Sequence, residues 1–552
     1  MPDGSPMPPA RTDAVVPARL AATDVADRVG SGPLLHAGLA LRALLVVLGA
    51  APLFVAHVAP LQDWPSHLAR VGILASVLDG NAFWTQYYDF NTFLLPNVAL
   101  DIGVLALTRL GLGIETAGMI FLLFSYALFV SGFWMVARAC SAASAEKLPL
   151  GILLFYSWSL FWGFINYTVG IGALFWAVAL YASISAGAWR KAGFAAVAAC
   201  AVFECHAVAA VLLVLLLACH DAAGVLSAGR PRLRDAPRYA PRFAGSASAA
   251  GVFLLLYVLS PAATDNKAEI IYIGADSLLG VLKWKVGVFA KAFLGGSVAS
   301  DAVFAACVVA SLCLAVFVSR VRMPVWAVLA VGALCAVVLV APQQFGAGSH
   351  LDNRLAAMPV LVAAAAARLE WRRAAAHRAA VAVLAVGVLA RGVALTADWS
   401  RAGAMIEALD AHFATLPRGS IVLTGYGKPA HGIGWGEFWS PPVGNIAALA
   451  ARHGVFVPTV FALPSQQPLV LKRRFHPWDM HATVSDPAEL GEVLARSRVL
   501  CRGELTQDPP PRVEMLVLYP GPFLGSGTTV PPMRPLLDRF GTMDMCDAND
   551  PG

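Results

Sequence analysis

An acid and an imidazole stand four residues apart directly after the first long apolar stretch of the chain. Residues 62–70 read QDWPSHLAR and include Asp63 and His67. A helix that starts at Pro65 would hold Asp63 at its N-terminus, with His67 on the same side one turn later. A carboxylate in that position stays ionised and can accept a proton from a hydroxyl or an amine. His67 would serve as a hydrogen-bond partner, a second base or a metal ligand. The alternative is structural: Asp63 caps the helix and Trp64 anchors it at a membrane surface.

Two arginines have the chemistry to hold a phosphate, because a guanidinium can grip two oxygens at once. Arg354 ends the segment SHLDNR, beside His350 and Asp352, where a late apolar stretch begins. Arg391 lies inside the last apolar stretch, where a charge is expensive and is usually paired or functional. For Arg354 the structural alternative is an interfacial cation that pairs with Asp352.

Further polar residues in apolar surroundings extend the set of expected substrate-binding residues. Asp89 follows two tyrosines, and Asp101 lies early in an apolar stretch, where it either takes part in function or pairs with a cation such as Arg391. Glu204 and His206 interrupt another apolar stretch. They line a polar cavity, or they mark a break between two short half-helices.

The elements that must position these residues are membrane helices. The chain of 552 residues is 58% hydrophobic and only 13% charged, against about 25% charged in an average soluble protein. Apolar stretches of about 20 residues, the length that crosses a bilayer, recur along it. The net charge of +6 is small for this length, and no basic face with interleaved aromatic residues occurs. We therefore expect an α-helical polytopic membrane protein embedded in a lipid bilayer, with no nucleic acid as a partner.

The arginine-rich loops predict an orientation, since such loops stay in the cytoplasm. Counting outward from residues 229–242 gives about eleven spans between residues 36 and 397, with the N-terminus inside and the first outer loop at 61–94. The second of these spans begins near Leu95, and the sixth covers residues 193–218. Four basic residues then fall on outer loops and disagree with this topology: Arg138, Lys147, Arg190 and Lys191.

The two ends of the chain have a different composition. Residues 1–35 lack an apolar core and are expected to form a disordered cytoplasmic tail. Residues 398–552 are expected to form a small α/β domain outside the cytoplasm, periplasmic if the protein resides in a bacterial inner membrane. A disulfide between Cys501 and Cys546 is one alternative there. The expected elements are helices at 405–417, 443–454 and 487–497 and strands at 419–425, 456–463 and 514–520.

An apolar span followed at once by an outer loop that opens on an acid, and then by many further spans, resembles the GT-C superfamily of integral-membrane glycosyltransferases. The stretch DWPSH is similar to the D-E-x-x-H-like segments of some members, and FWGFINYTVGIGAL resembles bacterial membrane proteins grouped near them. The resemblance implies a donor sugar on a polyprenyl phosphate, a lipid or glycan acceptor from the cell envelope, and Asp63 as base or metal-site acid. A divalent cation would then be the cofactor. Trp64 stands where many members have a second acid, so this chain departs from their metal site.

A non-catalytic protein is the alternative function, either a transporter or an assembly factor for envelope polysaccharide. Transporters often show an internal repeat and helices broken near the middle of the membrane. The two halves of this sequence show no repeat, while the interruption at Glu204 and His206 favours the transporter.

Overall fold

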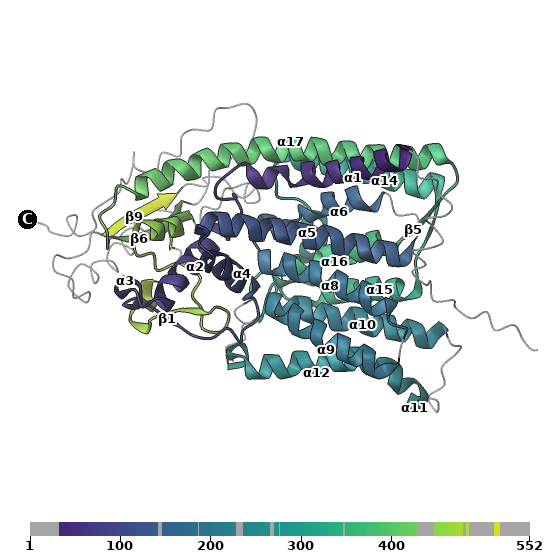
Figure 1. The fold of residues 1–552 in the computed structure, drawn as a ribbon, viewed down its shortest axis with the longest axis horizontal. Coiled ribbons are helices and arrows are strands. Elements are labelled where there is room, and N and C mark those ends of the chain that lie inside the picture. Colours follow the sequence, from purple (N-terminus) through teal and green to yellow (C-terminus); the bar gives the residue numbers. More distant parts are fainter. Residues whose placement is uncertain are drawn as a thin grey trace, which may run out of the picture.

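A computed structural model describes residues 33–141, 146–185, 187–227, 236–264, 270–274, 276–345, 348–427, 446–478, 482–484 and 513–518. Two groups of helices account for most of these residues. Long helices run side by side along the longest axis of the molecule, and shorter elements gather at one end of them (Figure 1). The expected tail at 1–35 lies almost wholly outside the described residues, as do Cys501, Cys546 and the expected helix at 487–497.

The bundle is built from apolar stretches that become helices with little or no polar face. Its helices are α1 (Pro33–Ala50), α5 (Ile114–Cys140), α6 (Lys147–Phe155), α8 (Ile165–Ser183), α9 (Ala188–Cys205), α10 (Ala207–Ser227), α12 (Ala244–Leu259), α14 (Val298–Val318), α15 (Val325–Val340), α16 (Leu351–Ala366) and α17 (Ala374–Phe413), and all but the short α6 have 16 residues or more. Of the helices in the described part of the chain, six are long and apolar enough to cross a membrane. The chain is thus a helical, multi-pass membrane protein.

Burial separates the centre of the bundle from its lipid-facing surface. In α8, 78% of the apolar window is buried inside the protein, whereas the figures for α12 and α14 are 17% and 11%. Apolar side chains that stay exposed on helices of this length require a hydrocarbon environment. We conclude that α8 is a central helix and that α12 and α14 present their surfaces to lipid.

Two of the expected spans differ in the structure, and the difference removes the conflict over the basic residues. The stretch expected as the second span forms only α4 (Ala99–Arg109), whose 11 residues extend about 16 Å, half the thickness of the hydrocarbon core. The stretch expected as the sixth span is two helices, α9 and α10, which meet at His206. The second expected span is thus lost, and the sixth is replaced by two. The helices between these two places therefore cross the bundle in the direction opposite to the expected one.

In the described part of the chain, the basic residues on the loops that follow α5, α8, α10, α14 and α16 consequently lie at one end of the bundle. The ammonium of Lys147 donates to Ala364 O at the end of α16 (2.7 Å), and that of Lys191 lies over the ring of Tyr181 at the end of α8. Arg242 donates to Gly224 O at the end of α10. Strand β3 (Ser319–Arg322) pairs antiparallel with β5 (Arg368–Trp371) at this same end (Figure 1).

Short elements from the first outer loop and from the C-terminal part share the opposite end. Helices α2 (Trp64–Leu78) and α3 (Ala82–Thr85) lead to β1 (Tyr88–Phe90), which pairs antiparallel with β7 (Leu469–Leu471). The rings of Tyr87 and Phe456 stack with their centroids 3.9 Å apart. The 3₁₀ helices η6 (Ile446–His453) and η7 (Arg473–Trp478) complete this group. The far end of α17 reaches it without a break, so no helix boundary falls at residue 398 (Figure 1).

The C-terminal part partly follows the expected elements. The strands expected at 419–425 and 514–520 are present as β6 (Ile421–Gly427) and β9 (Val513–Leu518), and β6 lies between β8 (Ala482–Val484) and β9 in a parallel sheet. The expected helix at 405–417 is the end of α17. The expected strand at 456–463 is wrong: these residues form turns and loops, apart from a single bridge at Phe456. Two prolines, Pro458 and Pro464, punctuate this stretch and prevent regular pairing.

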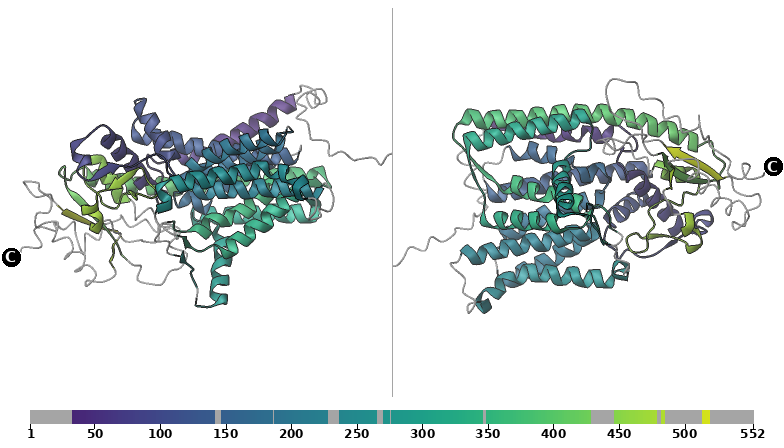
Figure 2. Two further views of the ribbon diagram at one scale, coloured as in Figure 1. Left: turned by 90° about the horizontal axis from the view of Figure 1, so that it is seen from below. Right: turned by 180° about the vertical axis from the view of Figure 1, so that it is seen from behind.

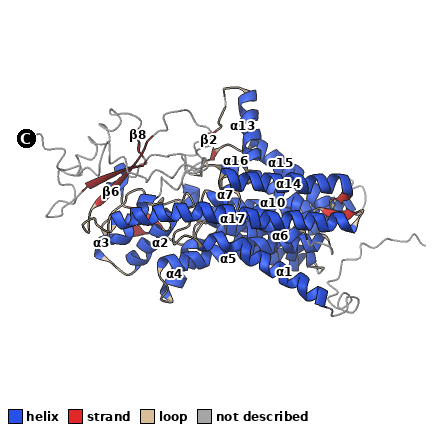
Figure 3. Cartoon of the chain, turned by 90° about the horizontal axis from the view of Figure 1, so that it is seen from above, coloured by secondary structure: helices blue, strands red, loops and turns tan. Residues whose placement is uncertain are grey.

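Several small elements connect the long helices. Helix α13 (Leu278–Lys291) points away from the bundle, across the direction of the long helices (Figures 2 and 3). Its buried Lys285 forms an ion pair with Asp352 at the start of α16 (2.7 Å). The remaining short elements are α7 (Trp158–Phe161), α11 (Ala236–Tyr239), η1 (Ala51–Phe54), η3 (Ala240–Phe243), η4 (Pro261–Thr264), β2 (Ile270–Ile271) and β4 (Gln344–Phe345).

Candidate functional site

The backbone of Asp63 is fixed by the turn that follows α7. The N–H of Gln62 donates to Phe161 O, and the N–H of Asp63 donates to Trp162 O, both at 3.0 Å. Gly163 closes this turn with a φ of +90°, and a Cβ atom there would lie 2.7 Å from Asp63 N. A residue with a side chain is disfavoured at this position twice, by its backbone angle and by the contact. The FWGF segment is therefore the support on which Asp63 rests.

Helix α2 then carries Asp63 and His67 on one face. The N–H of His67 donates to Asp63 O (3.1 Å), which closes the first turn. Pro65 lies in that turn, as expected, but the Asp63 side chain makes no capping bond. Trp64 is 2% exposed, so it is a core residue and not an anchor at the membrane surface. Of the structural alternative for this motif, the N-cap position of Asp63 is confirmed, but its side chain makes no capping bond and Trp64 is not at the surface.

His67 is held as a neutral ring with one nitrogen available. Its ring packs edge-on against Phe461. Loss of water on burial, followed by the positive charge of Arg70, lowers the pKa of His67 well below its usual value, although a backbone hydrogen bond with Gly163 opposes this. The Nδ1 atom is buried and has no hydrogen-bond partner. An imidazole with a lowered pKa is a weak base, so His67 suits hydrogen bonding to a ligand while Asp63 accepts the proton.

Arg354 reaches the same place from the first turn of α16. The Tyr167 hydroxyl donates to Arg354 O (2.7 Å) and ties the turn to α8. The guanidinium lies over the ring of Phe164, with its carbon 3.8 Å from the ring centroid. The Nε atom is buried without a partner. Burial lowers the pKa of the Arg354 guanidinium to about 10, and the negative charge of Asp63 opposes this shift.

His206 joins the site because it caps a helix. The N–H of Val208 donates to His206 Nδ1 (3.1 Å), as at an N-cap of α10. In a neutral ring whose Nδ1 accepts a bond, Nε2 carries the proton. Nε2 lies 3.2 Å from Arg354 Nη1, so two donors face each other. An acceptor that lies against both donors, such as a phosphate oxygen, would turn this unfavourable contact into two hydrogen bonds.

These four side chains line one cavity of about 230 Å³. Its volume is below the roughly 300–1,000 Å³ of pockets for drug-sized ligands, so it fits a polar head group whose tail lies outside. Four buried polar atoms without a partner belong to its lining residues: His67 Nδ1, Asn97 Oδ1, Arg354 Nε and Gln467 Oε1. Buried polar groups in native proteins are nearly always hydrogen-bonded. Their concentration in one cavity indicates a place that binds a polar ligand.

The C-terminal part supplies one wall of this cavity. Phe461, Leu463, Gln466 and Gln467 line it together with residues of the bundle. The N–H of Phe461 donates to the Ser66 hydroxyl on α2 (3.0 Å), and the Tyr88 hydroxyl donates to Val457 O (2.9 Å). The segment that follows η6 is therefore part of the site and not a separate cover.

Three other acids that the sequence suggested serve structural roles elsewhere. Asp101 receives two bonds from Arg70, at 2.7 and 2.8 Å, with both residues fully buried. This pair holds α4 on α2, so the cation is Arg70 and not Arg391. Asp352 pairs with Lys285 and does not neutralise Arg354. Asp89 lies on β1 with an exposed side chain, near Lys472 (3.3 Å).

Arg391 is also outside the cavity. Its guanidinium donates to the carbonyl oxygens of Leu153, Tyr156 and Phe293 at 2.8–2.9 Å, and its Nε donates to the Ser300 hydroxyl (3.3 Å). Four of the five N–H groups of the guanidinium are thereby bonded, and the Asp301 carboxylate lies 3.7 Å from Nη2. Arg391 joins three segments of the bundle and has no free face for a phosphate.

His350 and Glu204 border the site without lining the cavity. The backbone of His350 has a φ of +56°, and its ring lies against Trp162 with centroids 4.5 Å apart. Burial lowers the pKa of His350 to about 4, with further contributions from the charges of Arg354 and Lys291. The backbone O of Glu204 accepts a bond from the N–H of Val98 (3.0 Å), at the end of α9.

Among the described residues, no group of three or more His, Cys, Asp or Glu side chains lies close enough together to hold a metal ion. The residues that complete the cavity carry only weak signals in the sequence. Asn97 follows Pro96 and has a φ of +74°, and a Pro-Asn pair is a turn signal. Gln466 and Gln467 lie between two prolines in PSQQP, where their amides and the Ser465 hydroxyl are the polar groups.

The chain was compared with family models, with curated proteins and with solved structures, and none of the three comparisons found a match. The site is therefore interpreted from its own residues.

Proposed function

We propose that this protein is a membrane glycosyltransferase that takes a sugar from a polyprenyl-phosphate donor and gives it to a lipid or glycan acceptor. The observation that carries the proposal is the meeting of Asp63 and Arg354 in one cavity, together with His67 and His206. Such a transfer requires two groups: a carboxylate that can accept a proton and a cation that can hold a phosphate.

The proposed reaction follows from these roles. The acceptor hydroxyl oxygen bonds to the anomeric carbon of the sugar, and the bond between that carbon and the phosphate oxygen breaks. The hydroxyl proton passes to the Asp63 carboxylate, and the electron pair leaves with the polyprenyl phosphate. Arg354 and the Nε2–H of His206 stabilise the negative charge that grows on the departing oxygen. His67 orients the acceptor or the sugar through Nδ1.

The orientation is part of the proposal. With the basic clusters at one end of the bundle, the positive-inside rule places that end in the cytoplasm. The cavity then lies at the outer leaflet, where lipid carriers present sugars, and the C-terminal part is periplasmic in a bacterial inner membrane. The transporter alternative loses its support, because α9 and α10 are both full-length helices of 18 and 21 residues and meet at the end of the bundle.

Asp63→Asn and Arg354→Ala test the chemistry, with Asp89→Asn as the matched control because Asp89 is exposed and lies outside the cavity. We expect Asp63→Asn to slow sugar release from a polyprenyl-phosphate donor by about 10²–10⁴-fold, the usual effect of losing a general base. Arg354→Ala should weaken donor binding by about 10–100-fold, the value of a charged hydrogen bond. Wild-type protein that neither binds nor consumes any donor in a broad panel would refute the proposal.

A further inference from the structure

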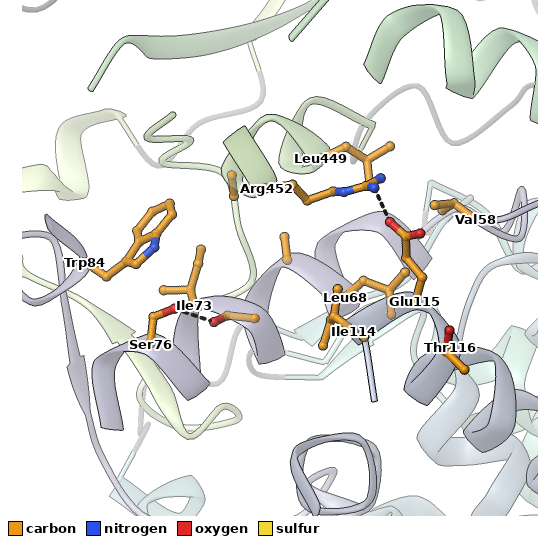
Figure 4. A pocket seen from close by; sticks show the side chains of 14 residues that line it. Val58, Leu68, Ile73, Ser76, Trp84, Ile114, Glu115, Thr116, Leu449 and Arg452 are labelled. Carbon is orange, nitrogen blue, oxygen red and sulfur yellow. Dashed lines mark hydrogen bonds and ion pairs between the residues drawn. The ribbon is translucent and has the colours of Figure 1, made fainter. Parts of the chain in front are cut away.

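A second cavity, of about 490 Å³, lies against the opposite face of α2 (Figure 4). Leu68 and Ile73 of α2 face it, whereas Asp63 and His67 lie on the other side of the helix. Ile114 at the start of α5 and Leu449 of η6 add further apolar wall. Its volume falls within the range of about 300–1,000 Å³ of cavities that hold small organic ligands.

The two charged side chains that line this cavity are paired with each other, and one of its hydroxyls is bonded to the backbone. Arg452 contacts the Glu115 carboxylate (Figure 4) and lies 3.5 Å from Asp410. The Ser76 hydroxyl donates to Gly72 O (3.0 Å). A cation held by two carboxylates does not attract an anion, so this cavity lacks the anion-binding character of the one at Arg354. The lining instead favours an apolar group.

Gly72 keeps the cavity wide. It lies in the middle of α2, where glycine weakens a helix relative to alanine. A Cβ atom at this position would meet no atom nearer than the Ile114 side chain at 4.0 Å. Close packing therefore does not require glycine here, and a larger side chain would occupy the cavity.

An apolar path connects the cavity with the lipid-facing surface of α5. Thr116 lines the cavity, and Ile120 and Phe124 follow at four-residue spacing on the same helix face. Their side chains are 40% and 50% exposed, within a helix that is apolar enough to span a membrane. A hydrocarbon chain in the bilayer can thus pass along this face as far as the cavity, where the one charged group of α5 that it meets, Glu115, is paired with Arg452.

We propose that this second cavity binds one hydrocarbon chain of a lipid, which enters sideways from the bilayer along α5. The chain belongs to an acyl lipid or to an isoprenoid, since both present the same saturated or methyl-branched surface to the apolar wall. The proposal does not depend on the chemistry at Asp63 and holds whether or not the protein transfers a sugar.

Photolabelling of the full-length protein in lipid nanodiscs tests this site. The probes are a 16-carbon fatty acid and an isoprenoid alcohol, each with a diazirine in the chain. We expect adducts on residues 68–76 and 114–124 with at least one probe, and the probe that labels more strongly identifies the source of the chain. Gly72→Leu should reduce this labelling at least fivefold, because its side chain fills the cavity.

Two further variants make the result decisive. Gly251→Leu, on the exposed face of α12 with open space around it, is the matched control and should leave the labelling unchanged. Thr116→Trp at the exposed entry should reduce labelling as Gly72→Leu does, and it remains informative if the glycine variant fails to fold. Equal labelling in all four proteins, or adducts confined to α12 and α14, would overturn the proposal.

Discussion

Arg354 and Arg391 are both arginines of bundle helices, and by sequence both were equally good phosphate ligands. Arg391 is fully buried and donates hydrogen bonds to three carbonyl oxygens and to the Ser300 hydroxyl. Arg354 leaves Nε without a partner and turns Nη1 toward the donor face of His206. A charge in an apolar stretch is thus no guide to function by itself. The difference between the two arginines is whether hydrogen bonds within the protein already occupy the N–H groups of the guanidinium.

The largest difference between the two arginines should appear in stability. Arg391→Ala leaves three buried carbonyl oxygens without a donor, and we expect it to lower the free energy of unfolding by about 3–5 kcal/mol. Arg354→Ala should lower it by less than about 1 kcal/mol, because it removes few bonds. Denaturant unfolding in detergent micelles measures both values, and equal losses would erase the distinction between the two arginines.

The support beneath Asp63 gives the next largest effect. Gly163→Ala introduces a Cβ atom 2.7 Å from Asp63 N at a φ of +90°, and we expect a loss of about 2–3 kcal/mol together with a displaced Asp63. Gly111 has a φ of +91° with no atom near its missing Cβ. Gly111→Ala is therefore the control for backbone strain alone and should lose about 1 kcal/mol. Similar losses in the two variants would show that the FWGF turn does not press on Asp63.

Lowering the pH should reduce the free energy of unfolding through His350, which lies near Arg354. The pKa of His350 is lowered to about 4 by burial, whereas an unfolded histidine titrates near 6.5. Between these values the unfolded chain binds more protons than the folded one, so the free energy of unfolding should fall as pH drops from about 6.5 to 4. His350→Gln should make this fall shallower without abolishing it, because burial also lowers the pKa of His67; thermal unfolding at several pH values measures the change. An unchanged slope in the variant would rule out His350 as the source.

The smallest expected effect separates the two roles of His206. Asparagine is a good N-cap, so His206→Asn should preserve the start of α10, whereas His206→Ala should cost about 1 kcal/mol. Both variants lose the Nε2 donor and should weaken phosphate binding alike. If His206→Asn bound phosphate lipids as well as the wild type does, His206 would be a cap and nothing more.

The sequence predicted the parts of this molecule that depend on local patterns. The apolar stretches predicted membrane helices, and QDWPSHLAR predicted that Asp63 and His67 share the first turn of a helix, which the bond from His67 N to Asp63 O confirms. Span boundaries were harder, because hydropathy counts Leu95–Arg109 as apolar although only α4 forms there. A hydropathy pattern also does not reveal that one helix ends at His206 and that His206 caps the next.

The rest of the site depends on contacts between distant segments. Arg70 forms an ion pair with Asp101, which lies 31 residues away in the sequence, and Lys285 forms one with Asp352, 67 residues away. No local sequence pattern predicts these partners. Phe461 and Gln467 come to the cavity because β7 pairs with β1, a pairing of three residues that sequence periodicity does not reveal. Sequence identified the chemically capable residues, and the fold decided which of them meet.

The central claim is that the cavity at Arg354 holds a phosphate group, and binding of a short-chain isoprenyl phosphate to the purified protein tests it most directly. Isothermal titration should give a dissociation constant that rises about 10–100-fold in Arg354→Ala. It should stay unchanged in Arg322→Ala, an exposed arginine paired with Glu370 on β5. Equal affinity in the wild type and Arg354→Ala would contradict the account.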